Sequence, residues 1–201
     1  MAKMVKYINN ELIEYDLLSL VDFYDPILRT PTKPIDFSTA LESDITHLLY
    51  SLSETLSKME GLGLSANQVG ISKRACAVNM GEKIWVMFNP YIVEKSETIS
   101  KYSEGCLSYP GLYLNLNRSN HIKVKFQAAG GQEVVKEFDG LTAVVIQHEL
   151  DHLDGVVFTE KVSPIKLDQA KRKTKTILKK MKRAQAPVPE DIIQQGISEL
   201  S

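Results

Sequence analysis

Residues 141–153 read Leu-Thr-Ala-Val-Val-Ile-Gln-His-Glu-Leu-Asp-His-Leu, and this stretch decides how the rest of the chain has to be arranged. It is long and apolar enough to form a buried helix. Its apolar positions include Leu141, Val144, Val145 and Leu153. A helix of this kind needs a cover of other elements, so we expect it at the centre of the fold.

The segments upstream of this helix have the patterns of one helix and several short strands. Residues 38–59 carry apolar side chains at spacings of three and four, which predicts a helix. Thr39 and Glu42 fit a capping box at its start, and Gly61 suits its end. The expected strands are 75–78, 84–88, 91–93 and 98–100, followed by a hairpin formed by 122–127 and 133–138. The expected fold class is therefore α+β, with mixed or antiparallel sheets around a central helix. This helix carries an HExxH motif at residues 148–152.

The composition is ordinary for a globular protein. The chain has 201 residues, of which 43% are hydrophobic and 24% charged, with a formal net charge of -1. This balance does not indicate nucleic acid or an acidic substrate for the protein as a whole. Two cysteines form no disulfide framework, and the N-terminus resembles no signal or transit peptide. No stretch is long and apolar enough to span a bilayer, so we expect a cytoplasmic protein without membrane contact.

Charge is unevenly distributed near the C-terminus. Residues 166–183 are strongly basic and carry a weak helical stripe at Ile177, Leu178 and Met181. The Ala-Pro-Val-Pro segment at 186–189 ends any helix, and we expect a loosely packed tail after it.

The segment from His148 to His152 is an H-E-x-x-H motif. Positions four apart share one face of a helix, so both imidazoles can bind the same metal ion. Glu149 then lies beside the ion, where a general base takes a proton from metal-bound water. The alternative, two histidines that only cap or pack, is disfavoured because two of the four histidines of the chain fall here.

A catalytic site of this type needs a third protein ligand. The extended downstream pattern places Phe158 where a ligating histidine would be needed, and Glu160 follows only eight residues after His152. The upstream soft donors are Cys76, which lies in an apolar strand, and Cys106, which follows a glycine. Cys106 is the better candidate.

Three segments resemble the signature motifs of the peptide deformylase family. Residues 61–68, Gly-Leu-Gly-Leu-Ser-Ala-Asn-Gln, are similar to G-x-G-L-A-A-x-Q, with Ser65 in place of the usual alanine. Residues 104–108 match E-G-C-L-S, and residues 147–155 match Q-H-E-x-D-H-x-x-G. The residues 25–29 resemble the N-terminal segment of the family. The likeness predicts an N-terminal extension at 1–19, a catalytic domain at 20–165, and a basic helix with a tail at 166–201.

The resemblance implies an enzyme that removes the formyl group from N-formylmethionine of nascent peptides and releases formate. The implied metal ligands are Cys106, His148 and His152, and the implied general base is Glu149. The Gln68 side-chain amide and the Leu107 backbone N–H would stabilise the oxyanion. The implied substrate contacts are the Gly63 backbone and the side chains of Leu62, Leu141, Val144 and Val145. For these four side chains, ordinary core packing is an equally good explanation.

Further residues have open interpretations at this point. Glu104 and Arg118 resemble a family ion pair that orients the second motif. Gln147 and Asp151 either steer the imidazoles or, for Asp151, form a solvated carboxylate. Ser65 adds a hydroxyl away from the chemistry, and Leu112 or Tyr113 takes the place of an arginine that holds the peptide in many bacterial relatives.

The ligand set suits Fe(II), which the resemblance implies natively, and also Zn(II) or another divalent transition metal. The basic helix either contacts ribosomal RNA, as in some bacterial relatives, or is a solvated helix. A different metallopeptidase or amidase, and a binding protein without turnover, are the alternative functions.

Overall fold

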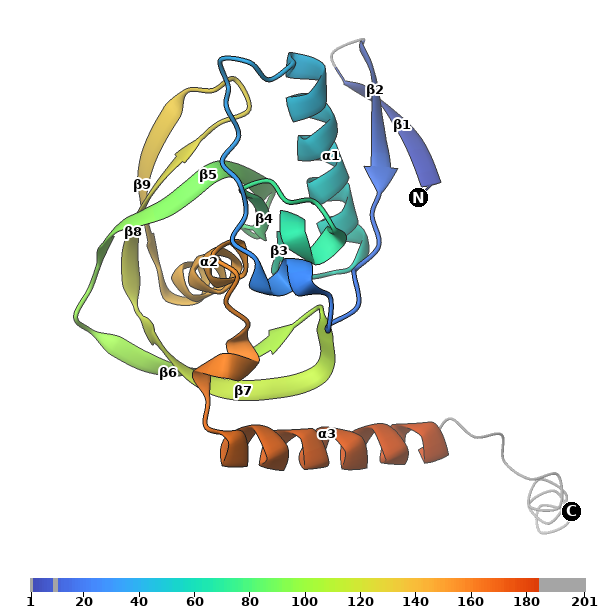
Figure 1. Ribbon diagram of the computed structural model, residues 1–201, viewed down its shortest axis with the longest axis vertical. Helices are drawn as coiled ribbons and strands as arrows, with labels where there is room; N and C mark the ends of the chain where they lie inside the picture. Colours follow the sequence, from blue (N-terminus) through green and yellow to red (C-terminus); the bar gives the residue numbers. More distant parts are fainter. Residues whose placement is uncertain (1, 9–10, 185–201) are drawn as a thin grey trace, which may run out of the picture.

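The computed structural model describes residues 2–8 and 11–184. Within them lie a two-stranded N-terminal hairpin, a five-stranded sheet, a second two-stranded sheet and three α-helices. Figure 1 shows helix α2 enclosed between the large sheet and the β6–β7 pair, with α1 on the far side and α3 below. The predicted combination of helices with antiparallel sheets is confirmed, since every ladder between named strands pairs antiparallel.

Helix α1 spans Glu42–Lys58 and buries one apolar stripe. The buried apolar members are Ile45, Leu48, Leu52 and Leu56. The predicted capping box is wrong, because the helix begins after Leu41 and Thr39 instead donates to the Asp36 carbonyl in a separate turn. The left-handed residue after the helix is Glu60, with φ 52°, rather than Gly61.

The large sheet has the order β3-β4-β5-β8-β9. Its strands are Gly63–Ser65, Ala75–Asn79, Ile84–Lys95, His121–Gln127 and Glu133–Asp139, in that order. Strand β5 joins the two expected strands 84–88 and 91–93 into one. Asn89 and Pro90 separate the two segments in the sequence. In the structure Asn89 adopts φ 48° at a shift in register, and the strand continues beyond it.

The second sheet is a long hairpin of β6, Ile99–Cys106, and β7, Tyr109–Ser119. Only the first residues of β6 were expected as a strand, and β7 was not expected. From Leu112 to Arg118 of β7 the buried positions alternate with exposed ones. The buried residues are Leu112, Leu114, Leu116 and Arg118. This hairpin carries Cys106 at the end of its first strand and turns its apolar face inward.

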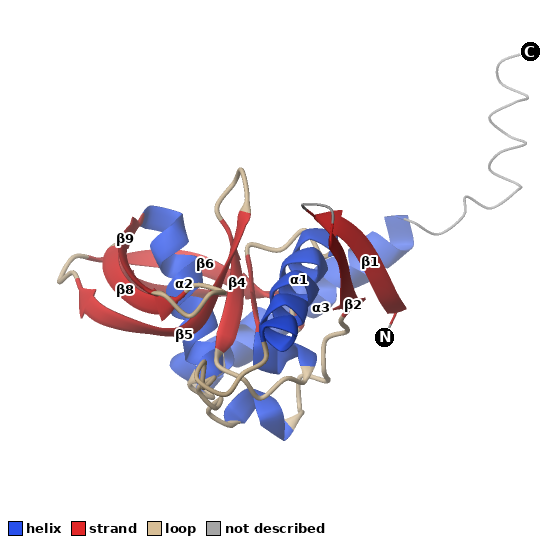
Figure 2. Cartoon of the chain, turned by 90° about the horizontal axis from the view of Figure 1, so that it is seen from above, coloured by secondary structure: helices blue, strands red, loops and turns tan. Residues whose placement is uncertain are grey.

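Helix α2 spans Gly140–Leu153, which confirms the expected helix at 141–153. It contacts strands of both sheets and the short helices at their edges. Figure 2 shows the same enclosure from above, with β8 and β9 curving around α2. Nine of its fourteen residues are buried, including charged and polar ones. The helix therefore has no solvent face on which to place His148, Glu149 and His152.

The N-terminal hairpin was not predicted. Its strands are β1, Ala2–Ile8, and β2, Glu11–Leu17. It lies along α1 through main-chain groups, since the Asp16 N–H donates to Ser51 Oγ at 2.9 Å and the Leu18 N–H to Thr55 Oγ1 at 3.0 Å. Side-chain to main-chain bonds of this kind leave no periodic signal in the sequence.

Short 3-10 helices η1, Pro26–Arg29, η2, Ala66–Val69, and η3, Phe158–Lys161, connect these layers. Helix α3, Pro164–Ala184, confirms the basic helix expected at 166–183. Leu167 and Ala170 anchor it against the β7 cluster, and Thr174 donates to the Gly111 carbonyl at 2.9 Å. The expected tail at 185–201 and the side chains of the expected stripe, Ile177, Leu178 and Met181, lie outside what the structure describes. Among the described residues, no helix has the length and apolarity needed to cross a membrane.

Candidate metal centre

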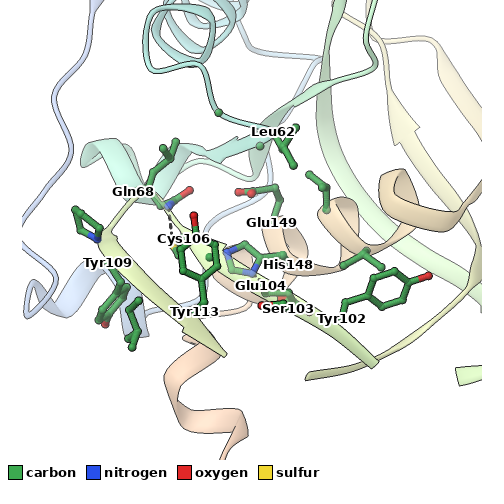
Figure 3. Close-up of a pocket in the computed structure, with 18 of the residues that line it drawn as sticks. Leu62, Gln68, Tyr102, Ser103, Glu104, Cys106, Tyr109, Tyr113, His148 and Glu149 are labelled. Carbon is green, nitrogen blue, oxygen red and sulfur yellow. Dashed lines mark hydrogen bonds and ion pairs between the residues drawn. The ribbon is translucent and has the colours of Figure 1, made fainter. Parts of the chain in front are cut away.

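Three side chains from two distant parts of the chain bring possible metal donors together. Cys106 comes from the end of β6, and His148 and His152 from the last turns of α2. Their donor atoms all lie within 4.8 Å of one another, and Cys106 Sγ is 3.2 Å from His152 Nε2. Figure 3 shows Cys106 and His148 facing the same pocket. The other cysteine, Cys76, is fully buried in β4, and burial raises the pKa of its thiol, as expected for an inert side chain.

The donor set fits a transition-metal ion. Ligands bound at roughly 2.0–2.3 Å around one ion lie a few ångströms apart, as these atoms do. One thiol and two imidazoles are a common set for zinc or ferrous iron, and three protein donors leave a position for water or substrate. Within the described residues, the carboxylate oxygen Glu149 Oε2 is buried without a hydrogen-bond partner and comes from the same turn of α2. We conclude that these residues can hold a catalytic metal.

A buried ionic network holds the two parts of this centre in register. Arg118 on β7 forms two hydrogen bonds with Glu104 on β6, at 2.7 and 2.8 Å, and both side chains are nearly inaccessible. Glu104 Oε2 also lies 3.0 Å from His148 Nδ1, and Arg118 contacts Asp151 at 2.5 Å. Glu104 therefore fixes the ring of His148 while Arg118 links the hairpin to α2.

This network corrects part of the expectation for the surrounding residues. Gln147 does not contact an imidazole, because its amide bonds to the main chain of Ser119 at 2.9 and 3.2 Å. Asp151 is neither a solvated carboxylate nor a direct partner of a ring, since Arg118 and Lys161 both contact it. The hydrogen-bond partner of the His148 ring is Glu104.

The electrostatics of the site favour positive charge at His148 and disfavour it at His152. Burial by itself lowers the pKa of His148, but hydrogen bonds with Cys106 and Glu104 outweigh it and raise that pKa to about 10. Burial lowers the pKa of His152, and the neighbouring His148 lowers it further. The Cys106 sulfur and the carboxylates of Glu104 and Glu149 thus attract positive charge to this position. A divalent metal ion bound here would be stabilised by the same groups that stabilise the proton.

The pKa of Glu149 is determined mainly by its burial. Glu149 is 3% exposed, and this burial raises the pKa of the carboxyl to about 7. A Cβ at Gly63 would collide with the Glu149 carboxylate, so glycine is required for the strand to pass this closely. The arrangement leaves a carboxyl that exchanges its proton near neutral pH beside the three donors.

Gln68 is held by its carbonyl oxygen, which leaves its amide N–H groups for the site. Its Oε1 accepts from the Ser65 N–H and from Ser65 Oγ, both at 2.9 Å. Its Nε2 lies 3.4 Å from Cys106 Sγ (Figure 3). The same nitrogen lies 3.0 Å from Ser108 Oγ. Ser65 was expected to add a hydroxyl away from the chemistry; in the structure this hydroxyl bonds to Gln68 Oε1 and helps to orient the Gln68 amide.

A cavity of about 440 Å³ opens beside these groups and is lined largely by apolar side chains. It contains all of the expected substrate and oxyanion residues, which are Leu62, Gly63, Gln68, Leu107, Leu141, Val144 and Val145. Leu62 and Leu141 are 51% and 58% exposed, so they are not core residues. Val144 is buried at 3% and contributes to both the cavity wall and the packing of α2.

Aromatic side chains complete the cavity, and of these only Tyr113 was expected near the substrate. Tyr102, Tyr109 and Tyr113 line it, all from the β6–β7 hairpin. The ring of Tyr113 lies over Gly105, where an added Cβ would come within 2.9 Å of it. The alternation of Leu and polar residues along 112–118 could have identified β7, and with it the strand that brings Tyr113 to the cavity.

Two side chains from distant segments, Asn67 of η2 and Thr32, cap the end of α2. The last carbonyls of a helix have no partner within it. Asn67 Nδ2 donates to the His152 carbonyl at 2.6 Å, and Thr32 Oγ1 donates to the Leu153 carbonyl at 2.9 Å. Asn67 is completely buried next to Gln68, so it ties the Gln68 segment directly to a donor residue.

A thiol, two imidazoles and a buried carboxyl beside an apolar cavity define a class of site, that of a candidate metal-dependent hydrolase. Comparison with known proteins identifies the family. The family model for polypeptide deformylase matches residues 17–168. The chain is 42% identical to the peptide deformylase of Chromobacterium violaceum over 79% of this chain and 95% of that protein, and 39% identical to that of Cellvibrio japonicus over 78% and 93%.

Solved structures agree with this assignment. The peptide deformylase of Thermotoga maritima matches with a TM-score of 0.70 at 36% identity, covering 74% of this chain and 99% of that one. That of Legionella pneumophila matches with a TM-score of 0.72 at 31% identity, covering 87% and 100%. The chain belongs to the polypeptide deformylase family and is an enzyme of that kind. Most of the N-terminal hairpin precedes the matched residues.

The buried Glu104 should make the fold sensitive to acid. Burial raises the pKa of this carboxyl, but hydrogen bonds from Arg118 and His148 outweigh it, so the pKa falls from 4.5 to about 2. Its ionised form then stabilises the fold above pH 4.5. We expect roughly 3 kcal/mol to be lost as the pH falls through that window toward 2. Urea unfolding of the metal-free protein at a series of pH values measures this loss.

Glu104→Gln provides the comparison for this measurement. The variant has no titrating group at this position, so its free energy of unfolding should depend less on pH over the same window. Parallel curves for the two proteins would contradict the assignment.

Removing the Asn67 side chain should weaken metal binding. Asn67→Ala deletes the bond to the His152 carbonyl, and loss of a partner that orients a ligand typically lowers metal affinity by about 10–100-fold. Titration of the metal-free protein with Co²⁺, followed by its absorption, measures the affinity.

Thr32→Val is the matched control for Asn67→Ala. It removes the same kind of bond from the adjacent Leu153 carbonyl, which belongs to a residue without a donor atom in the site. We expect lower stability with unchanged metal affinity. Equal effects of both variants on Co²⁺ binding would show that Asn67 acts only through general stability.

Proposed function

We propose that this chain removes the formyl group from N-formylmethionine at the start of nascent peptides, releasing formate. The observation that carries the proposal is the convergence of Cys106, His148 and His152 beside Glu149 in one apolar cavity. Membership of the deformylase family supports the same reaction. The catalytic domain is proposed to be residues 20–165.

Cys106, His148 and His152 would hold the metal ion. When bound, a divalent metal acts as a Lewis acid and lowers the pKa of water toward neutrality. The thiolate and two neutral imidazoles suit both Fe(II) and Zn(II), and the family resemblance favours Fe(II) in the native enzyme. Glu104 would keep the Nδ1 proton of His148 in place, which directs the other ring nitrogen to the ion.

Glu149 would act as the general base. Its carboxylate accepts a proton from the attacking water and then passes it to the departing amine nitrogen. A carboxyl with a pKa raised to about 7 by burial is suited to both steps near neutral pH. Its neighbour Gly63 leaves the space that this carboxylate occupies.

Gln68 and the Leu107 backbone N–H would stabilise the oxyanion that forms on the formyl oxygen. Donors placed before the reaction need no reorganisation as the charge develops. The bonds from Ser65 to Gln68 Oε1 keep the amide nitrogen directed at the site. This fixed orientation is what an oxyanion donor requires.

The apolar part of the cavity would bind the methionine side chain. Leu62, Leu141, Val144 and Val145 line it, and the first two are exposed. Burying a methionine side chain against them contributes about 1.5–3 kcal/mol. The backbone of Gly63, on the edge strand of the large sheet, would pair with the peptide main chain.

The reaction can be tested with the tripeptide formyl-Met-Ala-Ser. We expect formate release by the anaerobically purified, metal-loaded protein, with no cleavage of the internal peptide bonds. Glu149→Ala should keep the metal, because Glu149 is not a ligand, and should lose activity by about 10²–10⁴-fold. Formate detection and metal analysis on the same sample give both readouts.

Glu149→Gln separates the base from the shape of the cavity. It keeps the volume of the side chain and should be as inactive as Glu149→Ala. An active Glu149 variant would refute the proposed base. Cleavage of internal bonds would indicate a different peptidase, and metal binding without formate release would indicate a binding protein.

We also propose that helix α3 contacts ribosomal RNA. Its sequence contains seven lysines and two arginines against one aspartate. Phosphates attract such a surface, and the attraction weakens with salt. Leu167 and Ala170 fasten the helix to the catalytic domain, which would place the enzyme near the emerging chain.

Replacing Lys166, Arg172 and Lys173 by glutamine tests this contact without removing the anchor of α3. We expect reduced co-sedimentation with ribosomes and a weaker dependence on salt, by roughly 0.7–0.9 per lost phosphate contact in the logarithmic slope. Unchanged co-sedimentation would count against the contact.

A further inference from the structure

A second hollow, of about 1030 Å³, lies beside the catalytic cavity along α3. We call it the α3 groove. Its walls come from the segment around η1, from the start of β7 and from one side of α3. The residues that line it include Phe23, Tyr24, Arg29, Tyr109, Pro110, Leu112, Leu167, Lys171, Lys175 and Lys179.

The α3 groove and the catalytic cavity share part of their walls. Tyr109, Pro110 and Leu112 line both hollows. Tyr109 is fixed between them, because its hydroxyl donates to the Phe23 carbonyl at 3.2 Å and its ring packs on Phe158. A polypeptide that leaves the cavity over Pro110 therefore enters the groove directly.

One wall of the α3 groove is aromatic. The rings of Phe23 and Tyr24 lie 4.1 Å apart, and those of Phe23 and Tyr109 lie 5.6 Å apart. Tyr24 is 76% exposed. Exposed aromatic rings gathered in a hollow are typical of surfaces that bind side chains of a partner.

The opposite wall of the groove is basic. Lys171, Lys175 and Lys179 follow each other at intervals of four and so share one side of α3. All three are exposed, and none forms an ion pair with another residue that the structure describes. The single acid on the groove wall, Glu160, is already paired with Arg29 at 2.9 Å. The groove therefore presents uncompensated positive charge beside apolar rings.

We propose that the α3 groove holds the part of the substrate polypeptide downstream of its first three residues, and that it favours acidic and apolar side chains there. This inference rests on the proposed function, since it extends the binding of the same substrate. The continuity with the cavity favours a peptide over RNA, and an RNA phosphate surface would not need an aromatic wall continuous with the catalytic site.

The preference should be moderate in size. Ion pairs at exposed lysines are individually weak, so we expect three of them together to raise kcat/KM by roughly three- to tenfold. Because exposed charges are screened over about 10 Å at 0.1 M salt, the preference should shrink as salt is added. The effect should appear mainly in KM, because the groove does not touch the reacting atoms.

The test compares formyl-Met-Ala-Ser with the same peptide extended by about six residues, a length of roughly 20 Å when extended. One extension contains glutamate and leucine, and the other contains lysine and leucine. We expect the acidic peptide to have the higher kcat/KM. The variant Lys171→Gln, Lys175→Gln, Lys179→Gln should reduce the ratio of acidic to basic peptide toward one, and Tyr24→Ala should lower kcat/KM for both extended peptides relative to the tripeptide.

Lys166→Gln with Lys173→Gln is the matched control, because these two lysines line a hollow on the other side of α3. This variant should leave the acidic-to-basic ratio unchanged. Equal kcat/KM for both extended peptides in the wild type would overturn the inference while leaving the proposed function intact.

The remaining outcomes are also decisive. If neither the tripeptide nor the extended peptides release formate, the proposed function fails and the inference fails with it. If the Lys171, Lys175 and Lys179 variant loses ribosome co-sedimentation but keeps the peptide ratio, the groove lysines belong to an RNA surface and the inference is wrong.

Discussion

The buried pair of Glu104 and Arg118 is the interaction on which the candidate centre depends. It joins β6 to β7 through two hydrogen bonds and extends to α2 through His148 and Asp151. A buried ion pair contributes little net stability, but removing one partner leaves a costly unpaired charge. The pair therefore specifies one arrangement of hairpin and helix, and that arrangement brings the Cys106 thiol to the imidazoles.

The enclosure of α2 explains why its polar side chains have unusual proton affinities. A helix buried on most of its surface places Glu149 and both histidines away from water, where the charged form of each is penalised. The neighbours then decide the outcome for each group. His148 faces Glu104 and Cys106, which raise its pKa, whereas burial and the neighbouring His148 lower the pKa of His152. One helix thus supplies a ring whose pKa is lowered, a ring fixed by a carboxylate, and a carboxyl whose pKa is raised to about 7.

The sequence could predict those parts of the fold and site that depend on short-range patterns. The helical period of residues 38–59 and the spacing of His148 and His152 are local, and both helices formed in these regions, although α1 begins later, at Glu42. The choice of Cys106 over Cys76 also followed from local surroundings. By contrast, the N-terminal hairpin is held by Ser51 and Thr55 of α1, and such contacts between distant segments have no periodicity. The same holds for Asn67, whose importance comes from a carbonyl that lies far along the chain.

The β6–β7 hairpin connects the chemistry to the surface around it. Its buried side carries Glu104 and Arg118 for the centre, and its start at Tyr109 divides the cavity from the α3 groove. Helix α3 packs on the apolar residues of the same strand, because Leu167 and Ala170 contact the cluster that contains Leu112, Leu114 and Leu116. These leucines alternate with exposed residues and so share one face of β7 with Arg118. The residues that hold the metal donors in register and those that seat the basic helix therefore lie on a single strand face, and this places the α3 groove next to the catalytic cavity.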